Sequence, residues 1–126
     1  MRALADTSLF IAFEADRELA DEPPDEIAVS VVTVGELRLG VLMAADTVAR
    51  QRRLTTLQFA GGLDPLPIDD AVVSAWAGLI AALRAEGKQM RLNDSWIAAT
   101  AIANGMPVAT QDTDFDGAPG LDVIRL

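Results

Sequence analysis

The chain has 126 residues, of which 51% are apolar, enough to bury the core of one domain in a two- or three-layer fold. It contains no cysteine, histidine or tyrosine, which excludes disulfides, thiolate nucleophiles, Ser-His-Asp triads and metal sites built on histidine or cysteine. The 19 acidic and 10 basic residues give a net charge of −9, which argues against a nucleic-acid binder of the basic-patch kind unless metal ions cancel the charge of clustered acids.

Short β-branched or apolar runs alternate with longer segments of helical periodicity, a pattern typical of βαβ units around a parallel sheet. Strands are predicted at 2–5, 27–29 and 107–110 and from residue 123, with a proline-broken edge strand at 66–68. Helices are predicted at 7–14, after Ser30, and at 46–60, 69–86 and 92–104. We expect an α/β fold with three layers, α/β/α, around a central mainly parallel sheet, as a single domain over residues 1–126.

The expected helix ends and faces follow from residue type. Thr7 and Ser8 are expected to cap the first helix, and Asn93 or Asp94 the helix at 92–104. After Ser30, one apolar face is expected to contain Val34, Leu37, Val41 and Leu42. The longest apolar run, residues 71–83, is too short to span a bilayer, and no leader segment is recognisable, so we expect a soluble cytoplasmic protein.

The stretch V108-A-T-Q-D-T-D-F-D-G117 contains an aspartate at every second position from Asp112. The pattern resembles the start of an EF-hand calcium loop, but the twelfth residue from Asp112 is Val123 where such a loop has a bidentate glutamate. The residues before Asp112 also indicate a strand and not a helix. The sequence therefore favours a strand followed by an acidic loop.

Acidic residues occur wherever a predicted strand ends or the next helix begins. Each has a plain structural interpretation: Asp6 as a turn residue, Glu36 in a capping box with Thr33, Asp94 as a helix cap, and Asp112 with Asp114 in Asx-turns. Taken together, they are expected at one end of the sheet, where open α/β sheets place ligand sites. Carboxylates crowded there repel one another unless a cation binds them, and an all-oxygen ligand set selects Mg²⁺ or Mn²⁺.

Four segments carry a family resemblance: L4-A-D-T-S8, T33-V-G-E-L37, N93-D-S-W-I-A-A-T100 and A109-T-Q-D-T-D-F115. In order and spacing they resemble the four acidic motifs of PIN-domain ribonucleases, in particular the VapC-type toxins of bacterial toxin–antitoxin pairs. The resemblance covers essentially the whole chain. It implies a magnesium-dependent endoribonuclease that forms a homodimer and binds a cognate antitoxin, whose tail occupies the acidic groove.

The resemblance also implies roles for individual residues. Metal-site and catalytic acids are expected to be Asp6, Glu36, Asp94 and one member of the pair formed by Asp112 and Asp114. We favour Asp112 as the fourth acid, with Asp114 as a more distant or second-metal ligand. Around these acids, Thr7 and Thr110 are expected to orient metal-bound water through their hydroxyls, and Asn93 to steady the neighbouring carboxylate.

The expected reaction is metal-dependent hydrolysis of an RNA phosphodiester, in which Mg²⁺ lowers the pKa of a bound water and a second ion would stabilise the leaving oxygen. RNA must be bound by a net-negative protein, so basic residues are expected beside the acids. The candidates are Arg38, Arg50, Arg52 and Arg53. For the R50-Q-R-R53 cluster the alternative is a solvated helix face.

Three other classes remain open from the residues alone. A phosphatase of the haloacid-dehalogenase type also places D-x-D after an apolar strand, although its strand comes first in the domain. A phospho-acceptor receiver domain also clusters aspartates, but its late lysine has no counterpart, because Lys88 is expected in a turn after a helix. A non-enzymatic metal- or protein-binding module is the third.

Overall fold

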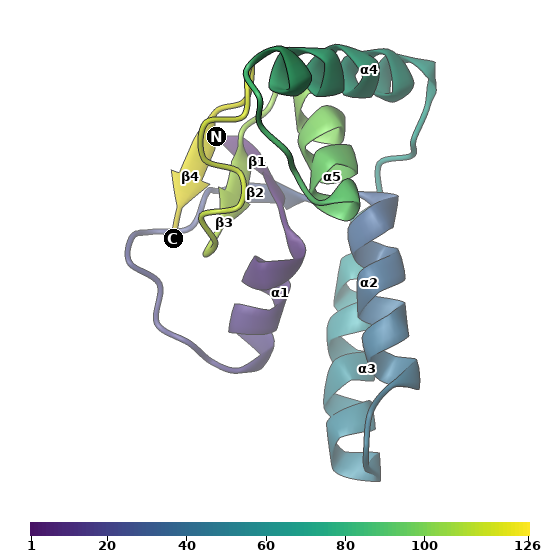
Figure 1. The fold of residues 1–126 in the computed structure, drawn as a ribbon. Coiled ribbons are helices and arrows are strands. Elements are labelled where there is room, and N and C mark those ends of the chain that lie inside the picture. Colours follow the sequence, from purple (N-terminus) through teal and green to yellow (C-terminus); the bar gives the residue numbers. More distant parts are fainter.

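A computed structural model describes residues 1–126 as four strands and five helices (Figure 1). In chain order the elements are β1 (Arg2–Ala5), α1 (Thr7–Glu14), β2 (Glu26–Ala28), α2 (Val31–Leu42), α3 (Thr47–Gly61), α4 (Asp70–Ala85), α5 (Leu92–Ala103), β3 (Val108–Thr110) and β4 (Val123–Arg125). All strand pairs are parallel, and the order across the sheet is β2-β1-β3-β4. The predicted α/β class and the parallel sheet are confirmed.

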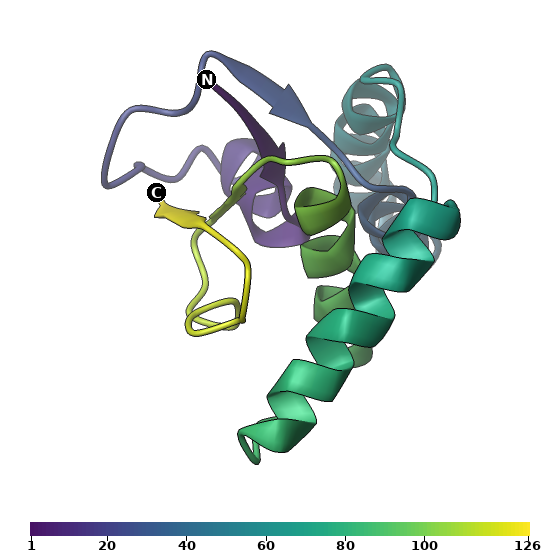
Figure 2. The same cartoon turned by 90° about the horizontal axis from the view of Figure 1, so that it is seen from above.

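Two separate cores cover the two faces of the sheet, because successive strand residues point to opposite sides. On one face Leu4 and Val108 pack with Leu79 of α4 and Ile97 of α5. On the other face Ala3, Ala5 and Ala109 pack with α1 and with one buried residue each from α2 and α3, Leu37 and Ala60. Helices therefore lie on both sides of the sheet, and Figure 2 shows α4 lying along the outer side of α5.

Helices α2 and α3 lie side by side as a hairpin that projects away from the sheet (Figure 1). Its free end carries exposed apolar side chains, with Leu42 73%, Met43 71% and Val48 70% exposed. The expectation that Leu42 shares the buried face of α2 is wrong, because the helix has left the core by that residue. No helix of the structure combines the length and the apolar character needed to cross a membrane.

Several predicted helix and strand ends need correction. The cap of α1 is Asp6, not Thr7 or Ser8, and its carboxylate accepts the Leu9 amide at 3.1 Å. In α5 the cap position is Arg91, which makes no side-chain cap bond, so neither Asn93 nor Asp94 caps this helix. The segment at 66–68 is not a strand but a single bridge between Ser30 and Leu66, because prolines on both sides of Leu66 interrupt the ladder.

Candidate active site

Asp6 follows β1 directly and is 3% exposed. Its Oδ1 accepts hydrogen bonds from the Leu9 amide and from the Ser8 hydroxyl at 2.8 Å, and its Oδ2 accepts one from the Thr110 hydroxyl at 2.7 Å. Three donors, two from the first turn of α1 and one from the end of β3, thus fix both carboxylate oxygens. The residue serves both as the cap of α1 and as a buried acid at the carboxyl end of the sheet.

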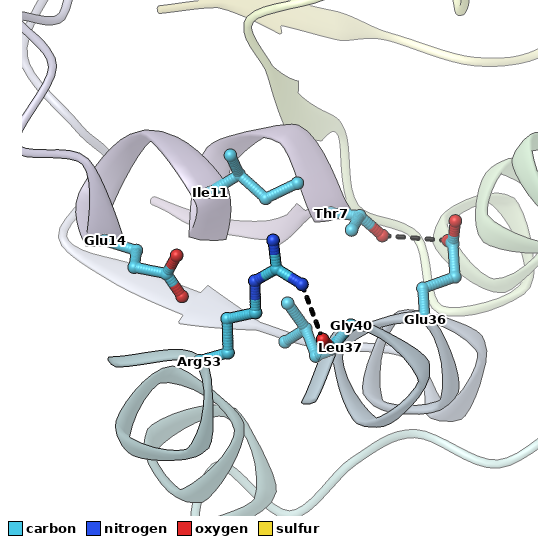
Figure 3. Close-up of a pocket in the computed structure, with 7 residues that line it drawn as sticks. All are labelled: Thr7, Ile11, Glu14, Glu36, Leu37, Gly40 and Arg53. Carbon is cyan, nitrogen blue, oxygen red and sulfur yellow. Dashed lines mark hydrogen bonds between the residues drawn. The ribbon is translucent and has the colours of Figure 1, made fainter. Parts of the chain in front are cut away.

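Glu36 reaches the same end from α2. Its Oε1 accepts a hydrogen bond from the Thr7 hydroxyl at 2.9 Å, and Thr7 is the first residue of α1 (Figure 3). The cap of α2 is Ser30, whose hydroxyl accepts the Thr33 amide at 3.1 Å. A capping box between Thr33 and Glu36 is therefore absent, and the glutamate is free to face α1 and the sheet.

Asp94 lies in the first turn of α5 and is 8% exposed. Its Oδ2 accepts a hydrogen bond from Nε of Arg91 at 3.1 Å, and the same guanidinium lies 3.4 Å from Oδ2 of Asp114 through Nη2. Asn93, expected to steady this carboxylate, is exposed and makes no hydrogen bond. In this structure Arg91, and not Asn93, contacts the Asp94 carboxylate.

The acidic loop after β3, residues 111–117, is anchored by Phe115, which is fully buried in the core beside α4 and α5. The Asp112 amide donates to the Thr110 hydroxyl at 3.0 Å, which is an ST-turn. Asp116, expected in the loop from sequence, forms an ion pair with Arg125 of β4. Asp112 and Asp114 precede the buried Phe115 in the chain, and their charges raise the pKa of Asp94. Asp116 follows Phe115 and pairs with β4 instead.

Several of these acids and Arg91 influence one another's pKa through their charges. Burial, opposed by its three hydrogen bonds and assisted by the charge of Asp112, raises the pKa of Asp6 from 3.8 to about 6. Burial also raises the pKa of Asp94; the Arg91 guanidinium lowers it, and Asp114 and Asp112 raise it. Glu36 in turn helps to raise the pKa of Arg91. All five predicted acids thus border one region at the carboxyl ends of the strands.

The raised pKa of Asp6 predicts a specific pH dependence of stability in the metal-free protein. A folded-state pKa above the unfolded one means that the folded state binds the proton more tightly, so this contribution is present at low pH and lost as pH rises through about 6. Between pH 7 and pH 5, the free energy of unfolding should rise by roughly 1 kcal/mol more in wild type than in Asp6→Asn. Urea unfolding in EDTA measures this, and parallel pH profiles would contradict it.

The donor set fits a hard divalent cation, because carboxylate and hydroxyl oxygens surround the region and the chain has no histidine or cysteine. A buried carboxylate such as Asp6, with a pKa displaced toward neutrality, is also typical of a functional site. In this structure no group of three acids converges closely enough to hold one ion. Asp6 is held by Ser8 and Thr110, and Asp94 with Asp114 by Arg91, so the acids border the region without forming a closed ligand cage.

A groove of about 300 Å³ runs between α1, α2 and α3, with Glu36 at one end (Figure 3). Glu36 also lines a second pocket together with Arg91 and Asp94. Arg53 reaches into this groove from α3 and donates to the Gly40 carbonyl at 2.7 Å. Arg50 lies 3.5 Å from the Ala44 carbonyl and does not line the groove, while Arg38 and Arg52 are exposed. The alternative of a fully solvated face does not hold for Arg53, which is half-buried and binds one of the last carbonyls of α2.

Sequence reasoning misses two residues of the site. Ser8 has the residue type of a helix cap, but its hydroxyl donates to Asp6, accepts the Gln111 amide at 3.1 Å and lies 3.1 Å from Thr110. Arg91 is absent from the sequence-based candidates. One feature of the sequence could have identified Arg91. It occupies the cap position of a helix, where Ser, Thr, Asp or Asn is preferred and where the helix dipole disfavours a positive charge.

The fold and the arrangement of acids define a class, and comparison with known proteins agrees. The PIN domain family matches residues 3–121. The chain belongs to the PIN-domain family. Ribonuclease VapC4 of Mycobacterium tuberculosis is 52% identical over 130 residues, covering 99% of this chain and 97% of that protein. Ribonuclease VapC5 of the same organism is 48% identical, covering 96% and 93%. The resemblance to VapC-type proteins is confirmed, and the phosphatase and receiver-domain alternatives lose their support.

Solved structures give the same result. VapBC-5 of Mycobacterium tuberculosis, a member of the VapBC family of toxin-antitoxin systems, superposes with a TM-score of 0.89 at 43% identity over 99% of this chain and 98% of the matched chain. FitAcB of Neisseria gonorrhoeae superposes with a TM-score of 0.76 at 29% identity, covering 98% and 96%. The three-layer architecture is therefore that of the family.

Proposed function

We propose that the chain is a metal-dependent endoribonuclease that hydrolyses RNA phosphodiester bonds, and that it is the toxin of a toxin–antitoxin pair. The observation that carries the proposal is that Asp6, Glu36, Asp94 and Asp112 come from four different segments and border one region at the carboxyl end of one parallel sheet. The ribonuclease VapC relatives, which align along nearly the whole chain, support it.

Mg²⁺ is the cofactor we assign, with Mn²⁺ as the substitute. When bound, the cation would act as a Lewis acid and lower the pKa of a bound water toward neutrality. We assign Asp6, Glu36, Asp94 and Asp112 as its holders and Asp114 as an outer or second-metal acid. Asp112 is preferred because its charge raises the pKa of both Asp6 and Asp94, whereas Asp114 forms an ion pair with Arg91. The hydroxyls of Thr7, Ser8 and Thr110 hold these carboxylates in position.

The proposed activity is tested by incubating the purified protein with a mixed RNA pool in Mg²⁺, in EDTA, and in EDTA followed by excess Mg²⁺. We expect internal cleavage that EDTA abolishes and added Mg²⁺ restores. Glu36→Gln is the matched inactive control, because it keeps the side-chain volume and an oxygen that accepts the Thr7 hydroxyl. Cleavage that survives in EDTA or in Glu36→Gln would point to a contaminating nuclease.

RNA binding is expected to depend on Arg52 and Arg53 in different ways. Arg52 is exposed and makes no ion pair, so Arg52→Ala should weaken RNA binding without affecting stability, and the salt slope should fall by about 0.7 for each phosphate that the arginine neutralises. Arg53→Ala should in addition cost about 1–2 kcal/mol of stability, because the Gly40 carbonyl loses its donor. Binding measured across a salt titration decides the matter; an unchanged slope in both variants would return this cluster to a solvated face.

The antitoxin is proposed to cover the groove of Figure 3. Ile11 and Leu37 line it with the acids Glu14 and Glu36, a lining suited to an apolar segment that carries basic side chains. A small basic-headed protein encoded just upstream would be the candidate partner. We expect the two proteins to purify together and Ile11→Arg to separate them. A stable complex with Ile11→Arg would place the antitoxin elsewhere.

We also infer that residues 1–126 act as one domain, that the protein is cytoplasmic, and that it forms a homodimer. The exposed apolar side chains support association with another protein surface: Met1, Leu39, Leu42, Met43, Val48 and Leu92 are each more than half exposed. Sedimentation of the isolated protein at micromolar concentration should give the mass of a dimer. A monomeric mass would contradict this.

A further inference from the structure

One guanidinium connects two candidate metal-site acids that come from different elements. Arg91 contacts Asp94 of α5 through Nε at 3.1 Å and Asp114 of the acidic loop through Nη2 at 3.4 Å. Because arginine presents its donors along a rigid planar fork, it can bind two carboxylates at once in a way that a lysine cannot. The contact therefore ties the loop after β3 to the first turn of α5.

Helix capping does not explain an arginine at this position: its pair with Asp94 is a local i,i+3 contact, but its pair with Asp114 reaches a different element. Arg91 occupies the cap position of α5 and makes no cap bond, and positive charge there opposes the helix dipole. None of the other ion pairs reaches a candidate acid: they join the N-terminus to Asp25, Arg2 to Glu26, Lys88 to Glu86 and Arg125 to Asp116. Arg91 is thus the one basic side chain paired with the acids.

We propose that Arg91 is a positioning residue that acts as the built-in counter-cation of the acidic site, neutralising Asp94 and Asp114 in the metal-free protein and competing with the divalent cation for them. This rests on the proposed function. A small pocket of about 290 Å³ lies beside the contact and is lined by Glu36, Arg91, Leu92, Asn93 and Asp94. Like-charged carboxylates around it need compensation, and the guanidinium supplies it before any cation binds.

Competition between Arg91 and the divalent cation predicts the direction in which cation affinity changes when Arg91 is removed. If Arg91 must be displaced from the carboxylates, its removal should strengthen cation binding; if it merely fills space, affinity should not change. The arginine side chain is 78% exposed, so each contact contributes as a surface ion pair does, and we expect Arg91→Gln to bind Mn²⁺ about fivefold more tightly than wild type at low salt. Arg91→Lys keeps the charge without the fork and should fall between the two.

The experiment is calorimetric titration of Mn²⁺ into wild type, Arg91→Gln, Arg91→Lys and the control Arg2→Gln. The control removes the same charge from a surface Arg–Glu pair at the amino end of β1, the opposite end of the sheet. Tighter binding in Arg91→Gln alone supports the proposal. Equal or weaker binding in Arg91→Gln overturns the competition, and equal tightening in Arg2→Gln reduces it to a net-charge effect.

A second arm needs no metal. Amide hydrogen exchange of residues 111–117 in EDTA should be several-fold faster in Arg91→Gln than in wild type or Arg2→Gln, because the loop loses its tie to α5. Unchanged exchange overturns the tie even in a protein that cleaves RNA. If wild type binds no Mn²⁺, the proposed function fails, and the exchange result still decides whether Arg91 holds the loop.

Discussion

Asp94→Asn should abolish most RNA cleavage while leaving the fold intact. The amide keeps the volume of the carboxylate and an oxygen that can accept a hydrogen bond from Arg91 Nε. It also removes a negative charge that burial disfavours, as the raised pKa of Asp94 indicates. The metal-free variant should therefore be no less stable than wild type. Outer-shell substitutions typically cost 10–100-fold in metal affinity or activity, so loss of a direct ligand should exceed roughly 100-fold.

The measurement pairs a cleavage assay with melting curves recorded with and without Mg²⁺. Wild type should melt at a higher temperature with Mg²⁺, and Asp94→Asn should lose that increase together with cleavage. Asp116→Asn is the matched control, since it removes the same charge from an exposed loop aspartate that pairs with Arg125 on β4. If Asp94→Asn still cleaves, or is stabilised by Mg²⁺ as strongly as wild type, Asp94 does not belong to the metal site.

Phe115→Ala should be the most destabilising single change in the acidic loop. The ring is fully buried against Leu79, Ile97 and Val108, and truncating a buried phenylalanine to alanine typically costs about 3–5 kcal/mol. The loop that carries Asp112 would lose its anchor in the same step. We expect reduced stability and, at temperatures where the variant remains folded, weaker Mn²⁺ binding.

Phe59→Ala is the matched comparison for Phe115→Ala. Phe59 is 54% exposed on α3, where its ring packs on Phe10 at a centroid distance of 6.2 Å, so its removal should cost about 1 kcal/mol or less and leave cation binding unchanged. Urea unfolding of both variants measures the difference. Similar losses of stability in the two would show that Phe115 is not the core anchor of the acidic loop.

The architecture was predictable because hydrophobic periodicity distinguishes strands from helices, and their order along the chain indicates a parallel sheet. The alternation of β-branched runs with helical segments predicted the five helices and the four strands, since the two cores require apolar residues at these spacings. Every bound that it gave lies within about a residue of the structure, while the ends of α2 and β4 were not predicted. Leu66 was the exception: it pairs with Ser30 through one bridge only, because prolines precede and follow it. Placing acids after strands likewise predicted that they meet at one end of the sheet.

The finer contacts of the site were not predictable from sequence spacing. Whether Ser8 caps a helix or binds Asp6 depends on which neighbours the sheet brings beside β1, and Thr110 is 102 residues further along the chain. Arg91 and Asn93 lie two residues apart at the start of α5. Only the tertiary structure shows that Arg91 contacts Asp114 of the acidic loop. Tertiary placement overrides the local preferences by which caps and turns are recognised.

Direct cation titration of single-acid variants tests most directly whether the acids form one site. Mn²⁺ is titrated calorimetrically into wild type and into Asp6→Asn, Glu36→Gln, Asp94→Asn, Asp112→Asn and Asp114→Asn, with stability checked in EDTA. We predict that the first four variants lose Mn²⁺ binding and RNA cleavage together while remaining folded, and that Asp114→Asn retains both in weakened form. Wild-type affinity in any of the first four would remove that residue from the site, and wild-type affinity in all of them would contradict a carboxylate metal centre.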